Sequence, residues 1–424
     1  MYTALLVVGF FGVVSYGKLQ HDARATAKND ALRYLEMSQQ TFADVENPFA
    51  LRLLTPWLVQ KSSEVTGVAP DTVWLALTFA ATTAALVVVY EIMRRSLRLS
   101  AGTSTVAALL LAVTYSYTSY NYGNFWLVDP VNNLVFALAL LCALERRLLS
   151  FVVVLLVGMV NKETAVLLAP LFLLLQVGRV GRLRDRGVLL AAGAAVVVVA
   201  AYLAFRAWAQ ARVGDNGTWL DDGMADIARI ALSSRRGGEH LAVFGVFNFL
   251  WVVFAYGLYR QYRASGLRSE LLLASAYLFV CCLIGRTQAT DTERVWVMLA
   301  PLVVVVAATV FDSWRTEAQR LWLVFLAAVY AALNFAWFSD DHGIFVNMAA
   351  VAVVLLVAHP PLRGAVLSGL PAPEAPGRTE THDGPDVRPR RPVPPVPGRP
   401  ADRDELPPVV LSGAHRPGAL PIHR

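Results

Sequence analysis

Four short stretches of the chain carry acidic and basic side chains that could do chemistry at a membrane surface. In the first, Asn29–Met37, a spacing of four places Asp30 and Tyr34 on one face of a helix. A single carboxylate there could accept the proton of a sugar hydroxyl while that hydroxyl attacks an activated donor. The alternative is that Asp30 only caps the helix, because Asn and Asp favour the capping position.

The second stretch contains Arg52, which stands alone in the apolar run from Pro48 to Pro56. A guanidinium at the membrane interface is costly without an anionic partner, and a phosphate matches its fork with two contacts. Arg52 is therefore a candidate phosphate ligand. The alternatives are that it reaches out to a lipid headgroup or pairs with Glu46.

In the third stretch, the tripeptide Asn161-Lys162-Glu163 interrupts the apolar segment 148–177. Each half of that segment is near the lower length limit for crossing a bilayer, so we predict a pair of short helices with the tripeptide at the turn. The compact ammonium of Lys162 suits a point contact with a phosphate, and Glu163 could hold it in place. The alternative is a turn that only anchors the chain at the interface.

The fourth stretch contains Glu293 and Arg294, which begin a predicted helix that runs on through Pro301. An arginine at a helix N-terminus opposes the helix dipole, so helix stability does not explain it. This favours ion pairing or anion binding, with anchoring of the helix end as the alternative. Asp129, followed by Pro130, is a further candidate, although this dipeptide also fits a plain helix start.

Six aromatic residues lie between the second and third stretches. They fit either a belt at the membrane interface or a surface on which a sugar stacks. The residues are Tyr115, Tyr117, Tyr120, Tyr122, Phe125 and Trp126.

The elements that must position these residues are membrane helices. The chain of 424 residues is 56% hydrophobic and 16% charged, with a mean hydropathy of +0.50, whereas soluble domains have about 25% charged residues. We predict an all-α polytopic membrane protein with about twelve transmembrane helices. The predicted spans are 2–16, 73–92, 103–117, 125–144, 148–160, 164–177, 188–208, 241–259, 270–284, 295–311, 321–337 and 344–358.

Charge then predicts the orientation of these helices. Arginines follow the even-numbered spans, such as Arg94 and Arg95 after the second, whereas the loops 118–124 and 339–343 contain no Lys or Arg. The positive-inside rule places both termini in the cytoplasm and all the candidate residues on the outer side. The first helix alone favours the reverse orientation, because its basic residues follow it. The skew toward arginine, with much Ala and Val, suggests a bacterium with a GC-rich genome.

The predicted domain organisation has two parts. Residues 1–358 form the transmembrane domain, with long outside loops at 17–70 and 213–240. Each loop carries a candidate amphipathic helix in the interface. The first spans residues 30–45 and is built on Leu32, Leu35, Met37 and Phe42, and the second lies around Met224, Ile227, Ile230 and Leu232. Residues 359–424 are rich in Pro and Arg and are predicted to be a disordered cytoplasmic tail.

Several classes of function have no motif in this sequence. We find no phosphate-binding glycine loop, dinucleotide fingerprint, nucleophile elbow or His/Cys metal spacing. ATP-driven transport by this chain alone is therefore not expected, nor is a cofactor. The net charge of +6 comes mostly from short loops and the tail, so it is a topology signal, and no nucleic-acid partner is expected.

These features resemble the GT-C superfamily of polytopic glycosyltransferases. The resemblance rests on Asp30 with Tyr34, on Asn161-Lys162-Glu163, and on the stretch from Glu293 to Pro301, which is similar to an element of actinobacterial envelope members. It implies an inverting transferase that takes a sugar from a polyprenyl-phosphate carrier at the outer face of the plasma membrane. The acceptor would be an envelope glycan, lipid or protein.

The resemblance also implies roles for the candidate residues. Asp30 would be the general base, although the family often has two adjacent acids here and this chain has Asn29 beside it, which leaves Asp22 and Glu46 open as alternatives. That departure also argues against a divalent metal, which needs several oxygen ligands. The predicted substrate- and phosphate-binding residues are Tyr34, Arg52, Asp129, Lys162, Glu163, Glu293 and Arg294.

Two other functions compete with this interpretation. The first is a non-catalytic membrane scaffold with a GT-C-like body. The second is a secondary transporter or lipid flippase, which would need ionisable groups near the bilayer midplane and usually internal repeats. The interiors of the predicted spans are almost uncharged and the two halves of the chain are not alike.

Overall fold

The computed structural model describes residues 29–40, 45, 47–181, 184–213, 239–286, 292–314 and 316–338. This part of the chain is helical and contains no strand, as predicted. The predicted first and last spans, the interfacial helix around Met224 and the tail lie outside it.

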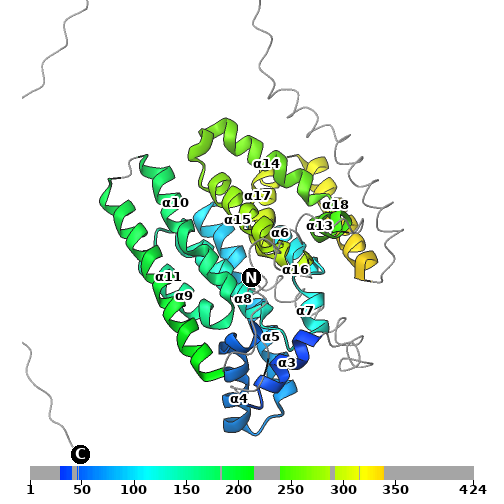
Figure 1. Ribbon diagram of the computed structural model, residues 1–424. Coiled ribbons are helices and arrows are strands. Elements are labelled where there is room, and N and C mark those ends of the chain that lie inside the picture. The colour runs from blue at the N-terminus through cyan, green and yellow to red at the C-terminus, as the bar shows by residue number, and fades with distance from the viewer. Residues whose placement is uncertain are drawn as a thin grey trace, which may run out of the picture. The chain divides into compact units, whose positions relative to one another are not determined.

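The helices are α3 (Asn29–Met37), α4 (Leu54–Thr66), α5 (Pro70–Glu91), α6 (Ala101–Val113), α7 (Ser119–Gly123), α8 (Asp129–Leu144), α9 (Leu148–Asn161), α10 (Ala169–Val180), α11 (Arg186–Val213), α13 (Glu239–Phe247), α14 (Leu250–Ser265), α15 (Glu270–Arg286), α16 (Thr292–Trp296), α17 (Ala300–Phe311) and α18 (Glu317–Phe338) (Figure 1).

Several of these helices can cross a membrane. By length and composition, 4 helical segments of the described chain qualify: Pro70–Ser96, Glu163–Val180, Arg186–Arg212 and Glu293–Phe311. A fifth would be the pair Leu250–Arg268 and Glu270–Arg286, which is bent by 103°. Shorter apolar helices, α6, α8 and α9, accompany them. The protein is therefore membrane-embedded, and the finer count of about twelve spans stays a prediction.

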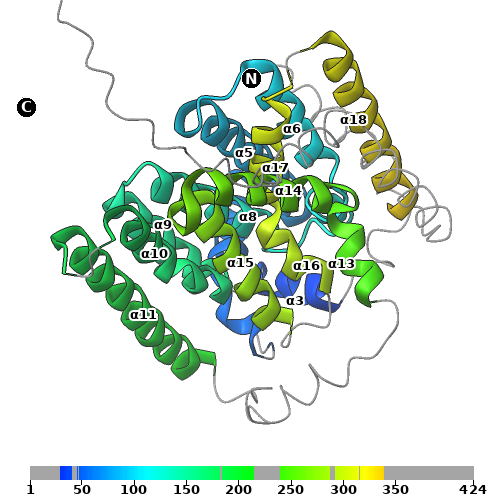
Figure 2. The ribbon, with the colours of Figure 1, turned by 90° about the horizontal axis from the view of Figure 1, so that it is seen from above.

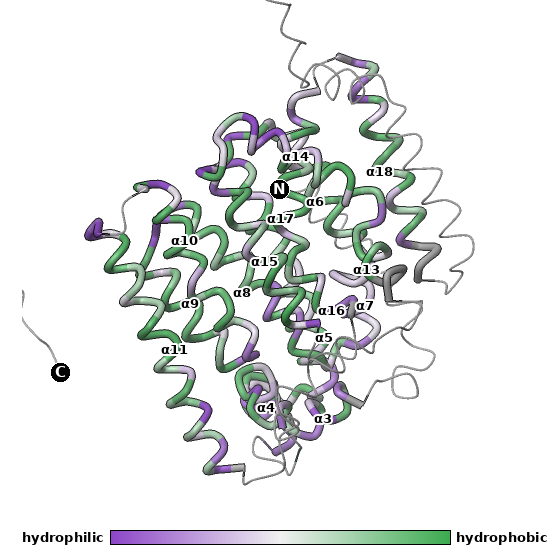
Figure 3. The backbone as a smooth tube through the Cα atoms, turned by 45° about the horizontal axis from the view of Figure 1, so that its top comes forward, coloured by the Kyte–Doolittle hydropathy of each residue, from purple (hydrophilic) through white to green (hydrophobic). Residues whose placement is uncertain are grey.

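Helix α17 lies in the interior of the protein, and helix α11 lies at its surface. The sequence of α17 is apolar on all sides, and nearly all its residues are buried between neighbours that include α6 and α14. The middle of α11 is also apolar, but Leu190, Val196 and Leu203 expose more than half of their surface. Figure 3 shows hydrophobic residues along both helices. We infer that the exposed face of α11 contacts lipid.

The predicted pair of short helices around the Asn161-Lys162-Glu163 turn is confirmed. Helix α9 ends at Asn161, and Lys162 has extended backbone with φ −159° and ψ 135°. A short 3-10 helix, η3 (Glu163–Leu168), then leads into α10, whose first turn contains Pro170. Helices α9, α10 and α11 lie side by side in both ribbon views (Figures 1 and 2). The turn thus places three consecutive polar residues at one end of a packed helix group.

Gly158 lets the last turn of α9 approach α8 closely. A Cβ atom at this position would lie 2.5 Å from Val135 Cγ1 and 3.0 Å from Ala165 Cβ. The carbonyl of Gly158 also accepts the backbone N–H of Lys162 at 2.9 Å. The glycine therefore fixes the distance between α8 and the turn that carries Lys162.

We predict that Gly158→Val destabilises the protein by about 1–3 kcal/mol, because the added atoms overpack a buried contact. Gly193→Val is the matched control, since no atom lies within 4 Å of a Cβ on that residue of α11. Thermal unfolding in detergent micelles measures both. Equal midpoints for the two variants would contradict the close approach.

Helices α8 and α10 carry candidate residues at one end and arginines near the other. Helix α8 begins at Asp129 and is followed by the Arg147–Glu145 ion pair; with 16 residues, its ends are about 24 Å apart. Helix α10 follows Glu163 and ends near Arg179, which donates to both oxygens of Glu270. The separation of the two sets of charges, predicted from the sequence, is thus built into individual helices.

Candidate functional site

Helix α3 presents Asp30 and Tyr34 to the rest of the protein. Its buried face consists of Ala31, Tyr34 and Met37, whereas Leu32 is 43% exposed. The predicted apolar face was therefore wrong in part, and the helix ends at Met37 instead of extending to residue 45. The physical reason is that the phenol of Tyr34 is satisfied inside the protein, so the helix buries the face that carries it.

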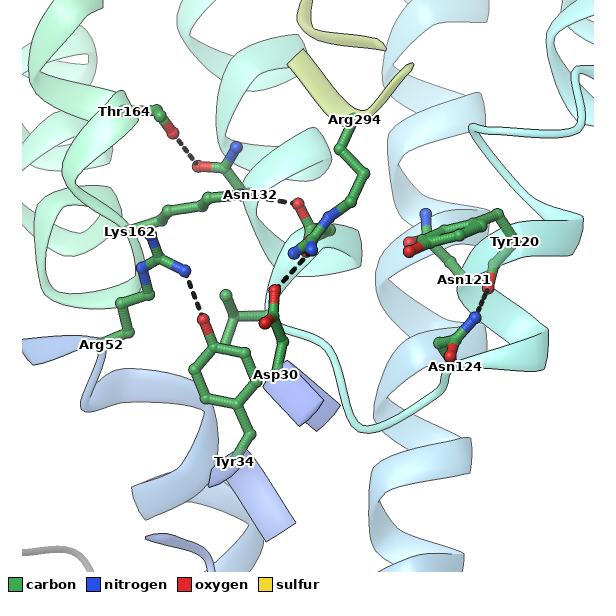
Figure 4. A network of polar contacts seen from close by, with 12 residues as sticks. Asp30, Tyr34, Arg52, Tyr120, Asn121, Asn124, Asn132, Lys162, Thr164 and Arg294 are labelled. Atoms are coloured by element: carbon green, nitrogen blue, oxygen red, sulfur yellow. Dashed lines mark hydrogen bonds and ion pairs between the residues drawn. The ribbon is translucent and has the colours of Figure 1, made fainter. Parts of the chain in front are cut away.

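Arg294 joins α3 to α8. Its Nη1 donates to Asp30 Oδ2 at 2.7 Å and its Nη2 donates to Asp129 Oδ2 at 2.6 Å (Figure 4). The Arg294 side chain is 12% exposed. Arg294 thus makes ion pairs, one of the two roles that its position favoured, and the interpretation of Asp30 as a mere helix cap does not account for this contact.

Asp129 is the centre of the arrangement. Besides Arg294 it binds Lys162, whose Nζ donates to Asp129 Oδ1 at 2.7 Å. Asp129 does start α8, as expected, but its carboxylate bridges two cations and its side chain is only 10% exposed. The prediction that Glu163 holds Lys162 was wrong, because the extended backbone at residue 162 sends the two neighbouring side chains to different partners. Burial lowers the pKa of Lys162, while the charge of Asp129 opposes this shift.

Glu163 binds Arg52. Nε of Arg52 donates to Glu163 Oε2 at 2.8 Å, and its Nη2 donates to the other carboxylate oxygen. Nη1 of Arg52 donates to the hydroxyl of Tyr34. Burial would lower the pKa of Arg52, but the ion pair with Glu163 raises it above the usual value. Burial raises the pKa of Tyr34 to about 12, so its hydroxyl stays protonated.

We call these charged residues the ion cluster. The formal charges of its three carboxylates and three cations cancel, while the more exposed Arg33 lies 3.8 Å from Asp30 Oδ1 as a further, weaker contact. A phosphate that binds there must compete with a carboxylate for a cation. A carboxylate that loses its cation becomes a better proton acceptor. The members are Asp30, Asp129, Glu163, Arg52, Lys162 and Arg294, with Tyr34 alongside.

Asn161 holds together the ends of the helices that carry the ion cluster, a role that the sequence analysis missed. Its amide donates to the carbonyl of Val128 at 3.0 Å and its oxygen accepts the hydroxyl of Thr55. Asn161 thereby ties the end of α9 to the start of α8 and to α4. The signal in the sequence was an asparagine at the end of an apolar run. The structure buries this amide fully, and a buried amide must be hydrogen-bonded.

The remaining candidates lie nearby but make other contacts. Glu293 Oε2 accepts the hydroxyl of Ser116 at 3.3 Å. Most of the aromatic cluster is inside the protein: Tyr117, Tyr122 and Trp126 are 1–2% exposed, and Trp126 donates to Asp71 at 3.0 Å. Neither an interface belt nor a stacking surface describes these three rings.

Within the described residues, no group of His, Cys, Asp and Glu is arranged to hold a metal.

A comparison with known protein families finds a match to part of the chain. Residues 48–205 match the family model described as dolichyl-phosphate-mannose-protein mannosyltransferase. This family is a GT-C superfamily domain. The match spans a little over a third of the 424 residues. The resemblance to the GT-C superfamily is thus confirmed, and a glycosyltransferase is the general kind of protein it supports. No curated protein matched the chain.

The GT-C match contains only part of the ion cluster. Asp129 and Lys162 lie inside the matched segment, whereas Asp30 and Arg294 lie outside it. The hydrogen bonds of Arg294 connect the two sets directly. Arg294 therefore links Asp30, which lies outside the matched segment, to Asp129, which lies inside it.

Proposed function

We propose that the protein transfers a sugar from a polyprenyl-phosphate-linked donor to a glycan, lipid or protein acceptor at the outer face of a bacterial plasma membrane. The observation that carries this proposal is the bridge made by Arg294. It brings the first-loop acid, Asp30, and the polar turn at Lys162 to one place through Asp129.

The proposed chemistry is an inverting displacement. Asp30 removes the proton of the acceptor hydroxyl, and the oxygen attacks the anomeric carbon of the donor sugar. The bond from that carbon to the phosphate oxygen breaks, and the phosphate leaves with the electron pair on its lipid. Asp30 suits the base because its side chain is 28% exposed, whereas that of Asp129 is 10% exposed.

The cations of the ion cluster would stabilise the departing phosphate. Arg294, Lys162 and Arg52 each offer charge-assisted hydrogen bonds at a site where negative charge develops. Because Arg294 is bound to Asp30 before a donor arrives, a phosphate on Arg294 would release Asp30. The freed carboxylate oxygen would then be open to the acceptor hydroxyl only when donor is present.

The positions of the arginines support the outer-face assignment. Arg94, Arg95 and Arg179 lie at helix ends remote from the ion cluster, and positive charge accumulates on the cytoplasmic side of membrane proteins. A donor carried by a lipid also needs no nucleotide pocket, which agrees with the motifs missing from the sequence. Both termini would then be cytoplasmic.

The competing proposal is a membrane scaffold without activity. It is favoured by the charge balance, because an ion cluster with equal numbers of cations and carboxylates can be purely structural. A transporter is supported less, because the ionised residues gather at helix ends and not at mid-helix.

Turnover distinguishes these proposals. We would reconstitute the purified protein in vesicles with polyprenyl-phosphate sugars, beginning with the mannosyl donor that the family description suggests, and add a membrane extract as acceptor source. We expect release of polyprenyl phosphate together with labelled acceptor. Donor binding without any release, across a panel of sugars, would instead establish the scaffold.

A further inference from the structure

Two neighbouring helices, α5 and α8, are each followed by an arginine at the end remote from the ion cluster. Helix α5 starts beside α3, where Trp74 donates to Ser38 at 3.1 Å, and continues through a π-helix, η2 (Ile92–Ser96), to Arg98. Helix α8 starts in the ion cluster and is followed by Arg146. Because α5 packs along α8 and η2 also contacts α8, the two arginines follow adjacent helix ends.

Arg98 and Arg146 have left-handed backbone, with φ of 56° and 62°. A residue with a Cβ atom is strained in this conformation, and helix ends that need it usually have glycine. The chain follows this rule elsewhere, since Gly67 ends α4 with φ 71° and Gly181 ends α10 with φ 67°. Asn248, the other described non-glycine residue with positive φ, is of a type that tolerates it. The two arginines thus occupy positions at which glycine is the more stable choice.

Contacts inside the protein do not explain this choice. Both left-handed arginines are exposed, and neither makes a hydrogen bond or an ion pair through its side chain with any described residue. Their neighbours are paired instead: Arg95 binds Glu91 at 2.6 Å, and Arg147 binds Glu145 at 2.8 Å. A cation near a helix C-terminus also favours the helix dipole, but a residue with ordinary backbone serves this equally well.

The two helix ends lie at a membrane surface. The segment Pro70–Ser96 is long and apolar enough to cross a bilayer, and Arg98 follows it by two residues. The stretches 91–98 and 145–147 contain five arginines and two glutamates, which gives a net charge of +3. An anionic phospholipid presents a phosphate at this depth, and the guanidinium fork matches phosphate oxygens with two contacts. Both position and charge therefore favour a lipid headgroup as the ligand.

We propose that Arg98 and Arg146 bind the phosphate of an anionic phospholipid headgroup at the membrane surface opposite the ion cluster. Two helix ends are then less stable than glycine would make them, and the unpaired guanidiniums are satisfied by lipid. The proposal goes beyond sugar transfer and does not depend on it, because no residue of the ion cluster takes part. It implies that anionic lipid binds to the protein and stabilises it more than neutral lipid does.

Titration with defined lipids tests this site. The full-length protein in neutral detergent micelles is titrated with phosphatidylglycerol and, separately, with phosphatidylcholine. Bound lipids are counted by native mass spectrometry, and the midpoint of thermal unfolding is measured on the same samples. The test variant is the double substitution Arg98→Gly with Arg146→Gly. The matched control, Arg95→Gln with Arg147→Gln, removes the same charge from the same two stretches, from side chains that are 68% and 62% exposed.

We expect the glycine variant to bind phosphatidylglycerol at least about tenfold more weakly, since each arginine at a membrane surface contributes about fivefold in affinity for anionic lipid. Its midpoint in neutral micelles should equal or exceed that of the wild type, because glycine relieves the left-handed backbone. The control should keep its phosphatidylglycerol affinity within about twofold, because both of its arginines are already paired with a glutamate.

Three results would overturn the proposal. Equal losses of phosphatidylglycerol binding in the two variants would show that the net charge of this surface attracts lipid without a defined site. Lower stability of the glycine variant in neutral micelles, with lipid binding unchanged, would show that the arginines serve the helix ends. Stabilisation by inorganic phosphate as large as that by phosphatidylglycerol would mean that the ligand is a soluble anion.

Discussion

Replacing Asp30 with asparagine is expected to reduce sugar transfer by at least about a hundredfold while the protein stays folded, because one proton acceptor is lost with almost no change in volume. The asparagine oxygen can still accept the hydrogen bond that Arg294 donates to Asp30. The loss should therefore fall on the turnover rate and leave donor binding nearly unchanged. Turnover is measured with the reconstituted protein and a saturating lipid-linked donor.

Glu36→Gln is the matched control for this experiment. Glu36 lies on the same helix, its side chain is exposed, and it is not a member of the ion cluster. Its removal should leave turnover within about twofold of the wild type, as is usual for surface substitutions. Full activity of Asp30→Asn would move the base to Asp22 or Glu46, which lie outside the described residues. Activity that survives Asp30→Asn, Asp22→Asn and Glu46→Gln alike would show that the general-base assignment is wrong.

Replacing Asp129 with asparagine is expected to lower the free energy of unfolding by about 3–5 kcal/mol, because it leaves two buried cations without their shared carboxylate. Asp129 accepts hydrogen bonds from Lys162 and from Arg294, and its side chain is 10% exposed. The two cations would then repel each other across a neutral amide. Unfolding by heat or denaturant in micelles measures the loss.

Two comparisons sharpen this second prediction. Glu145→Gln, at the other end of α8, removes an ion pair whose partner Arg147 is 62% exposed, and should cost no more than about 1 kcal/mol. The double variant Asp129→Asn with Lys162→Met should recover part of the loss, since it removes one of the unpaired charges. A loss for Asp129→Asn as small as that of Glu145→Gln would mean that the ion cluster contributes little to stability.

The sequence by itself determined the class of the protein and the positions of the chemistry. Its apolar content indicated membrane helices, and the length of the runs on each side of Lys162 predicted two short helices. The position of Arg294 at a helix start indicated that helix stability does not explain it and favoured ion pairing or anion binding over anchoring only weakly. These conclusions depend on local spacing and on the energetic cost of a charge in apolar surroundings, so neighbouring residues were sufficient for them.

Only the tertiary structure decided which carboxylate meets which cation. The partners in the ion cluster are 33, 111, 165 and 264 positions apart in the chain. Lys162 was expected to pair with Glu163 beside it, yet it binds Asp129, and the buried rings of the aromatic cluster were expected at a surface. Helix periodicity fixes which residues share a face, but the packing of distant helices fixes which faces meet. That packing made Asp129, whose position also fitted a plain helix start, the centre of the site.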